Sequence, residues 1–272
     1  MRLFFTGSPN CRKTIWGGFA GSPNCRKTIW GVPRKDAIRK KLAAALAVVL
    51  LSALPTACGT TPEKGAVLKD ETQKSAGILS GLNIVVDAGH GGFDIGTQGA
   101  RTRVPECDVN LAIAKLLEEK LAGEGAAVVM TREGRDAIAG TKEEDMQTRA
   151  EIIRAAAPDI MVSIHQNRYG DPDVAGPQVF YLLKGTKAEA LAKYVQQALN
   201  DELKIKHPRT AMSGQYKILR PGMGPSIIVE CGFLSSPQEE KLLIDPAYQK
   251  KLAAAIVVGI KAFAERNLEI KV

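Results

Sequence analysis

The sequence predicts an α/β fold in which helices cover both faces of a mostly parallel, twisted central sheet. Short apolar runs alternate with longer stretches of helical periodicity, and this alternation holds only from about Leu82 onward. The chain has 272 residues, of which 45% are hydrophobic, which suffices for one good core. We therefore expect a single globular domain over residues 82–272.

Five strands and four helices account for this domain. The first expected helix has a stripe that includes Val109, Ile113 and Leu117 and ends before Gly123. The last has a similar stripe of Leu252, Ile256, Ile260 and Phe263, and both stripes indicate core packing. The expected strands are 83–88, 126–131, 160–165, 178–182 and 226–230, and the expected helices are 109–122, 144–157, 187–203 and 246–265.

Three segments precede the domain. Residues 7–17 recur unchanged as residues 21–31, so we expect 1–31 to be a duplicated leader that is disordered or wrongly included, with translation starting near Val32. Residues 32–58 have the basic and then apolar pattern of an export signal, with an apolar run too short to span a bilayer comfortably. Lipidation at Cys58, an ordinary signal peptide and an uncleaved anchor all remain open. Polar residues 59–81 predict a linker.

The net charge of +8 comes from the N-terminal segments. Residues 1–57 hold 10 of the 37 basic residues but one of the 29 acidic ones, so the remainder holds 27 basic and 28 acidic residues. A nearly neutral domain with 5% aromatic residues does not indicate nucleic-acid binding. Membrane contact is expected only through the N-terminal segment.

Three apolar runs end in residues that can bind metal or move protons. His90 follows the expected strand and glycine turn at 83–89. His165 comes directly after the apolar run 160–164, and Glu230 comes directly after the apolar run 226–229. Parallel strands share one carboxyl edge, so these side chains should converge there. The segment 91–105 could fold Glu106 back over the same edge. His90, His165 and Glu106 would then provide the two histidines and one carboxylate that make up the three-ligand set of a zinc hydrolase.

Each residue also has a simpler interpretation when taken alone. The turn at His90 could be a phosphate cradle or a purely structural turn, and His165 could be a hydrogen-bonded core histidine. Glu106 could complement the helix dipole. However, two of the three histidines, His90 and His165, stand with Glu230 at the ends of apolar strands, and this joint placement favours a catalytic site. Glu230, in an apolar setting that raises its pKa, would then supply the acid and base that amide cleavage needs.

Five motifs follow one another from about residue 83 toward the C-terminus, namely DAGHGG at 87–92, ECDVNL at 106–111, MTR at 130–132, SIHQN at 163–167 and IVECGFLS at 228–235. Together they resemble the zinc-dependent N-acetylmuramoyl-L-alanine amidase family. The resemblance implies one zinc ion held by His90, Glu106 and His165, catalysis by Glu230, and cleavage of the amide between N-acetylmuramic acid and L-alanine in peptidoglycan. Two further stretches, 176–181 and 237–240, resemble germination-specific spore-cortex amidases, which implies a role in muramic δ-lactam formation. The export segment 32–58 predicts that the protein is secreted or tethered to the membrane, outside the cytoplasm.

Competing functions remain at this point. A zinc peptidase acting within the stem peptide or cross-bridge would use the same ligands, and a non-catalytic peptidoglycan-binding protein would keep the fold without turnover. An activating protein partner that orders 91–105 also stays open.

Two alternative roles remain open for each of several other residues. Arg132 and Arg149 could bind substrate carboxylates. The alternative is that each is an ordinary arginine that faces solvent or pairs with an acidic residue of its own helix. Gln166 and Asn167 could orient a ligand or bind substrate amides. The remaining expectations are that Cys107 and Cys231 are structural and that His207 lies on the surface.

Overall fold

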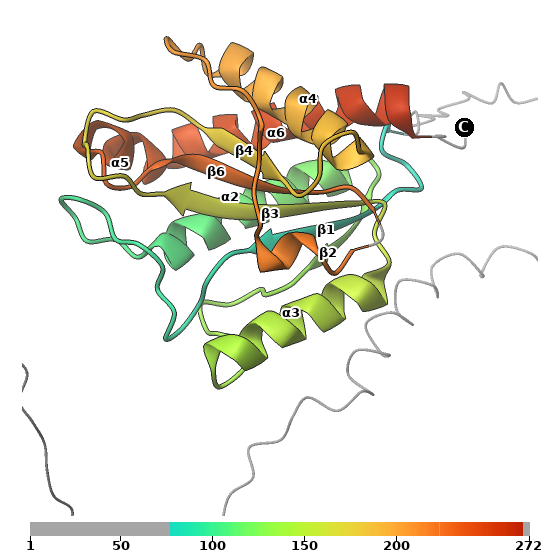
Figure 1. Ribbon diagram of the computed structural model, residues 1–272, viewed down its shortest axis with the longest axis horizontal. Coiled ribbons are helices and arrows are strands. Elements are labelled where there is room, and N and C mark those ends of the chain that lie inside the picture. The colour runs from blue at the N-terminus through green and yellow to red at the C-terminus, as the bar shows by residue number, and fades with distance from the viewer. Residues whose placement is uncertain (1–76, 223, 269–272) are drawn as a thin grey trace, which may run out of the picture. The chain divides into compact units, whose positions relative to one another are not determined.

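A six-stranded sheet runs through the part of the chain that the computed structural model describes, residues 77–222 and 224–268 (Figure 1). The predicted leader 1–31, the export segment 32–58 and the linker up to residue 76 lie outside these described residues. Within them, none of the helices has the length and apolar character needed to cross a bilayer.

The sheet is mostly parallel, as the sequence predicts. Its order is β2-β1-β3-β6-β4-β5, and β4 is antiparallel to β6 whereas the other neighbouring pairs are parallel. The strands are β1 (Asn83–Ala88), β2 (Ala127–Met130), β3 (Ile160–Asn167), β4 (Gln178–Tyr181), β5 (Met212–Ser213) and β6 (Ser226–Phe233).

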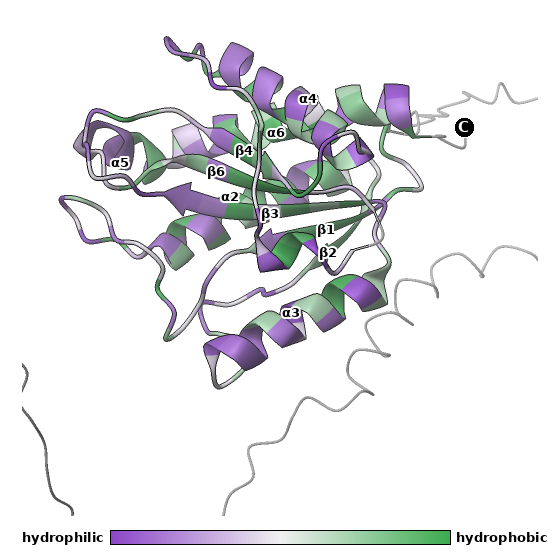
Figure 2. Cartoon of the chain, viewed as in Figure 1, coloured by the Kyte–Doolittle hydropathy of each residue, from purple (hydrophilic) through white to green (hydrophobic). Residues whose placement is uncertain are grey.

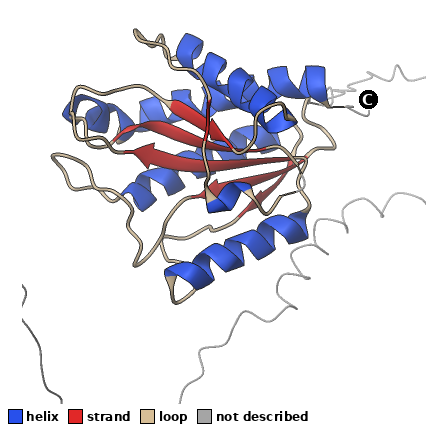
Figure 3. Ribbon diagram, viewed as in Figure 1, coloured by secondary structure: helices blue, strands red, loops and turns tan. Residues whose placement is uncertain are grey.

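Helices cover both faces of the sheet (Figure 3). One face packs against α2, α4 and α6, and the other against α3 and the short 3-10 helix η2. The helices are α2 (Glu106–Gly123), α3 (Lys142–Ala156), α4 (Lys187–Glu202), α5 (Pro237–Leu243) and α6 (Pro246–Asn267), with η2 at Lys217–Leu219.

Alternate residues of β1 enter opposite layers of the core. Ile84 and Val86 belong to the larger cluster with α2 and α6, whereas Val85 belongs to the smaller one with Ile153 of α3. This two-sided burial explains why the strands read as continuous apolar runs. Figure 2 shows the apolar strands inside and polar residues along the exposed side of α3. Leu79, just before β1, is also fully buried.

The boundaries differ from the predictions where periodicity gives no signal. Helix α2 begins at Glu106, three residues before the predicted start, because its first turn is polar and follows Pro105. Helix α5, which was not predicted, has seven residues and Pro237 in its first turn, too short for a periodic stripe. Strands β3 and β6 continue past their predicted ends to Asn167 and Phe233.

Candidate metal centre and acid–base residue

His90 lies two residues beyond β1 in a turn with unusual backbone geometry. Its φ is 61°, in the left-handed region that side chains other than glycine rarely adopt. The guanidinium of Arg149 donates to the carbonyl oxygens of Ala88 at 2.7 Å and of His90 itself at 2.6 Å. The turn is therefore held from inside the fold in the conformation that presents the imidazole.

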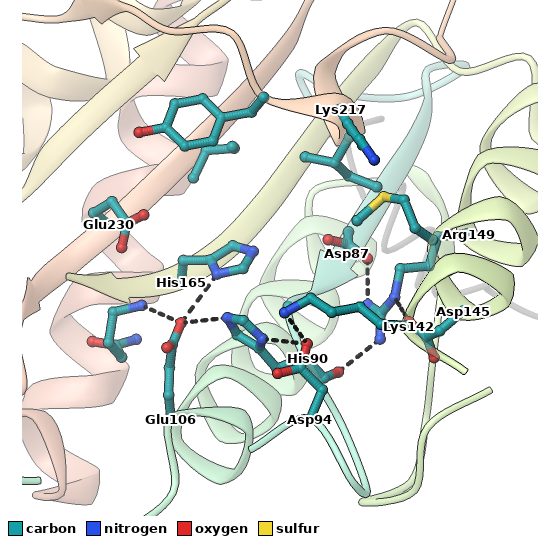
Figure 4. Close-up of a pocket in the computed structure, with 16 residues that line it drawn as sticks. Asp87, His90, Asp94, Glu106, Lys142, Asp145, Arg149, His165, Lys217 and Glu230 are labelled. Atoms are coloured by element: carbon teal, nitrogen blue, oxygen red, sulfur yellow. Dashed lines mark hydrogen bonds and ion pairs between the residues drawn. The ribbon is translucent and has the colours of Figure 1, made fainter. Parts of the chain in front are cut away.

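His165 and Glu230 come from neighbouring strands. The β3–β6 register sets these two residues directly opposite each other. The sequence placed them at strand ends, but β3 and β6 continue for two and three residues beyond them. The pairing register shifts between His165 and Asn167, which is the irregularity of a β-bulge. Both side chains nevertheless reach the carboxyl edge of the sheet, close to the His90 turn (Figure 4).

Glu106 is brought to this edge by the loop that precedes α2. The loop folds on itself through a bridge between Gln98 and Pro105, and the backbone N–H of Thr97 donates to Glu106 Oε2 at 2.8 Å. The other oxygen, Oε1, accepts from the N–H of Gln166 at 3.1 Å and from the side-chain amide of Asn110 at 3.2 Å. A carboxylate that is 3% exposed is thus held in one orientation.

The three predicted ligands form one cluster. Their candidate ligand atoms all lie within 4.8 Å of one another. Glu106 Oε1 is 3.0 Å from His165 Nδ1 and 3.4 Å from His90 Nε2. Figure 4 shows both imidazoles turned toward this carboxylate. Two nitrogen donors and one carboxylate oxygen, with open space beside them, match the donor set of a catalytic zinc site.

The ionisation of the cluster follows from these contacts. Burial would raise the pKa of Glu106, but hydrogen bonds and charge from His165 and His90 hold it well below its usual range. Burial lowers the pKa of both histidines, but Glu106, together with Asp94 beside His90 and Glu230 beside His165, more than offsets burial, so the pKa of each histidine is raised. The cluster therefore favours an ionised carboxylate, the state needed to bind a cation.

Glu230 differs from Glu106 in its surroundings. Burial raises the pKa of Glu230 to about 7, the effect predicted from its apolar strand, although His165 opposes the shift. Its Oε2 atom is buried and has no hydrogen-bond partner among the described residues. A carboxyl group with a pKa near neutrality and a free oxygen beside a metal-ligand cluster is suited to proton transfer.

Asp94 is a site residue that the sequence analysis missed. Its Oδ2 is 2.9 Å from His90 Nδ1 and 3.1 Å from the ammonium of Lys142. The contact occupies Nδ1 and leaves Nε2 facing Glu106. A carboxylate four residues after a candidate histidine ligand, in the same glycine-rich turn, was the signal that could have found it.

Arg132 and Arg149 are both buried, so the solvated role is wrong for both, whereas the helix-pairing role is confirmed for Arg149, which pairs with Asp145 of its own helix. Arg149 is 2% exposed and pairs with Asp87 at 2.8 Å and with Asp145 at 2.6 Å. Arg132 is 3% exposed and donates to the carbonyl oxygens of Ala88, Gly89, Cys107 and Gly134. These arginines support the turns that carry the candidate ligands.

The remaining candidates have structural positions. Cys107 and Cys231 are buried free thiols outside the ligand cluster, and burial raises the pKa of both. Gln166 lines the cavity; its backbone N–H donates to Glu106 Oε1, and its side-chain amide donates to Asn110 Oδ1 at 3.2 Å. His207 is exposed, as predicted.

A cavity of about 320 Å³ opens over the cluster. It reaches from Glu230 across the two histidines to Lys142, Met146 and Lys217 (Figure 4). Gly89 lies under the His165 ring so closely that an added Cβ would overlap it. The backbone of this turn therefore needs glycine to let the two candidate ligands approach.

Comparisons with known proteins agree with this geometry. The family model for N-acetylmuramoyl-L-alanine amidases matches residues 84–262. The germination-specific N-acetylmuramoyl-L-alanine amidase of Bacillus subtilis (strain 168) is 35% identical over 198 residues, covering 70% of this chain and 83% of that relative. The amidase AmiA of Escherichia coli (strain K12) is 29% identical over 278 residues, covering 83% of this chain and 91% of AmiA.

A solved structure is also similar. The CwlD amidase from Clostridioides difficile, in complex with the GerS lipoprotein, superposes with a TM-score of 0.65 at 32% identity. The match covers 68% of this chain and 98% of that one. The sheet and its helices therefore belong to a recurring architecture.

Proposed function

Because the chain belongs to the N-acetylmuramoyl-L-alanine amidase family, we propose that His90, Glu106 and His165 hold its zinc ion and that Glu230 transfers the protons of the reaction. Amidases of this family act on peptidoglycan and generally depend on zinc. The reaction is hydrolysis of the amide that joins the lactyl group of N-acetylmuramic acid to L-alanine.

The donor set fits zinc. Two imidazole nitrogens and one carboxylate oxygen lie within 4.8 Å of one another, and no thiol belongs to the group. A zinc ion held there would polarise the amide carbonyl and lower the pKa of a water molecule. The buried network around Glu106 keeps the ligands in place before any ion arrives.

Glu230 then has two tasks. Its unpartnered Oε2 accepts the proton of the attacking water, and the same group later donates it to the alanine nitrogen, which leaves as an amine. A pKa of about 7 suits both steps, because neither protonation state is strongly disfavoured at neutral pH. This buried, unpaired oxygen beside the cluster is the observation that supports the assignment most directly.

Asp94 would act through His90. By engaging Nδ1 it holds the ring so that Nε2 faces the carboxylate of Glu106. Such carboxylate–histidine pairs orient ligands and raise their basicity.

The test is digestion of purified peptidoglycan by the purified chain, scored by new free amino termini. An amidase exposes N-terminal alanine, whereas a peptidase acting within the stem peptide or cross-bridge exposes a different residue. A wall-binding protein without turnover exposes none. Glu230→Gln should abolish the release of alanine termini while leaving zinc content unchanged.

The proposal also includes a biological role, which is in the spore cortex, and a location, which is outside the cytoplasm. The similarity to a germination-specific amidase favours preparation of cortex peptidoglycan for muramic δ-lactam formation. Deleting the gene in its host should then remove muramic δ-lactam from the cortex, with vegetative wall unchanged. Export through residues 32–58 is part of this proposal, and is checked by fractionating the cells.

A protein partner is a further part of the proposal. The Clostridioides difficile neighbour was solved in complex with a lipoprotein. If this chain also needs a partner, the purified chain alone should bind less than one equivalent of zinc and gain activity when the partner is added. Full zinc occupancy and full activity of the isolated chain would contradict such a need.

A further inference from the structure

Among the described residues, the lysine and arginine side chains that line the cavity are paired with carboxylates, with one exception on the side away from Glu230. Arg149 pairs with Asp87 and Asp145, and Lys142 pairs with Asp94. Glu106 is held by the two histidines. Lys217 also lines the cavity, and among the described residues no carboxylate pairs with its ammonium group. Figure 4 shows Lys217 on the opposite side of the cavity from Glu230.

A second hollow continues from this point. It has a volume of about 350 Å³, lies between α3 and η2, and shares Met146 and Lys217 with the first. Arg154 and Arg220 line it as well, with Glu143 as the acidic residue in its lining. The path leading away from the metal-ligand cluster on this side is therefore basic.

The buried arginines cannot provide this positive charge to a ligand. The guanidinium groups of Arg132 and Arg149 are committed to carbonyl oxygens and carboxylates inside the fold, at 3% and 2% exposure. Lys217 is exposed on a short 3-10 helix, and so its ammonium group is free to meet a ligand that enters the cavity.

Building on the amidase function proposed above, we propose that Lys217 forms a subsite for a free carboxylate of the stem peptide. The lactyl carboxyl group of the glycan is consumed in the amide bond, so the free carboxylates of this substrate lie on its peptide part. With the scissile amide beside Glu230, a peptide running toward η2 passes Lys217 and then enters the basic hollow of Arg154 and Arg220. Lys217 thus selects the direction in which the peptide lies and favours acidic stem peptides.

The test compares two soluble muramoyl-peptides that differ only in whether the peptide carboxylates are free or amidated. The full chain and the variants Lys217→Gln and Lys217→Arg are assayed on both substrates for kcat and KM. Lys115→Gln is the matched control, because Lys115 is an exposed lysine of α2 on the other face of the sheet and its loss changes net charge equally. Thermal unfolding of each variant checks that the fold is kept.

Lys217→Gln should lower kcat/KM for the free-carboxylate substrate by about 3- to 10-fold, mainly through KM, because exposed charge pairs have modest energies. The amidated substrate should change by less than about twofold, and Lys217→Arg should restore most of the loss. The wild-type preference should weaken at high salt.

Equal losses on both substrates, or no loss on either, would overturn the subsite. A change in kcat alone would also overturn it, since it would assign Lys217 to the chemistry. Failure of the wild-type chain to cleave either substrate would instead count against the proposed amidase function, so the two failures are distinguishable.

Discussion

Replacing Glu230 by glutamine should make the metal-free protein more stable at alkaline pH while removing its activity. The carboxyl group is buried, and its pKa in the folded protein is raised from 4.5 to about 7. Ionising it in the folded state is therefore harder than in the unfolded chain. Glutamine has nearly the same shape and never ionises, so it escapes this cost.

The size of the effect follows from the pKa difference. At pH 4 both states of the wild-type protein hold the proton, and the substitution should change the free energy of unfolding little. As the pH rises from 4.5 through 7, the unfolded state releases its proton first and wild-type stability falls. Above pH 8 the shift corresponds to about 3 kcal/mol in favour of the variant, at about 1.4 kcal/mol per pKa unit.

Urea unfolding of chelator-treated protein at pH 4.5, 6, 7 and 8.5 measures this difference directly. Glu119→Gln, an exposed glutamate on α2, is the matched control and should show no such trend. Activity on peptidoglycan at pH 7 should fall by about 10²- to 10⁴-fold in Glu230→Gln. A stability gain that is the same at every pH would refute the reasoning, because it would come from packing rather than ionisation.

Three further changes probe the support of the site. Asp94→Asn should weaken zinc binding by about 10- to 100-fold in a chelator competition assay, because the carboxylate of Asp94 orients His90. An unchanged zinc affinity would show that Asp94 does not support His90 as a ligand. Arg149→Met should cost about 3–5 kcal/mol in urea unfolding at pH 7, because Asp87 keeps its charge without a cation; a cost below about 1 kcal/mol would contradict this. Gly89→Ala should displace the His165 ring and reduce zinc content measured by atomic emission, and full zinc occupancy would show that the turn can move aside.

Part of this site could be predicted because buried parallel strands are easy to recognise as apolar runs, although β3 and β6 continue past the residues at which those runs stop. The apolar runs before His90, His165 and Glu230 mark buried parallel strands, and parallel strands bring their carboxyl ends to one edge. Local sequence does not reveal the register that sets His165 opposite Glu230. That register depends on pairing between strands more than 60 residues apart in the chain.

The buried arginines show the limit of sequence reasoning most clearly. A charged residue is normally placed at the surface, because burying an unpaired charge costs several kcal/mol. Arg149 is buried because its acceptors come from β1 and the turn that follows it, 59 to 62 residues earlier in the chain, and from its own helix at Asp145. Only the assembled fold supplies that set. Asp94 was missed for a similar reason, since its role depends on how the turn folds back.

Arg132 donates hydrogen bonds to the carbonyl groups of Gly89 and Cys107, and these bonds form without a metal ion. The domain should therefore fold whether or not zinc is bound. These carbonyls adjoin two of the candidate ligands, His90 and Glu106, and the guanidinium joins their turns without any ion. Small zinc domains that fold only around their metal lose their structure to a chelator. Here the metal-free protein should stay folded after treatment with a chelator. Cobalt can then be bound in place of zinc, and its absorption spectrum would report the ligand geometry during catalysis.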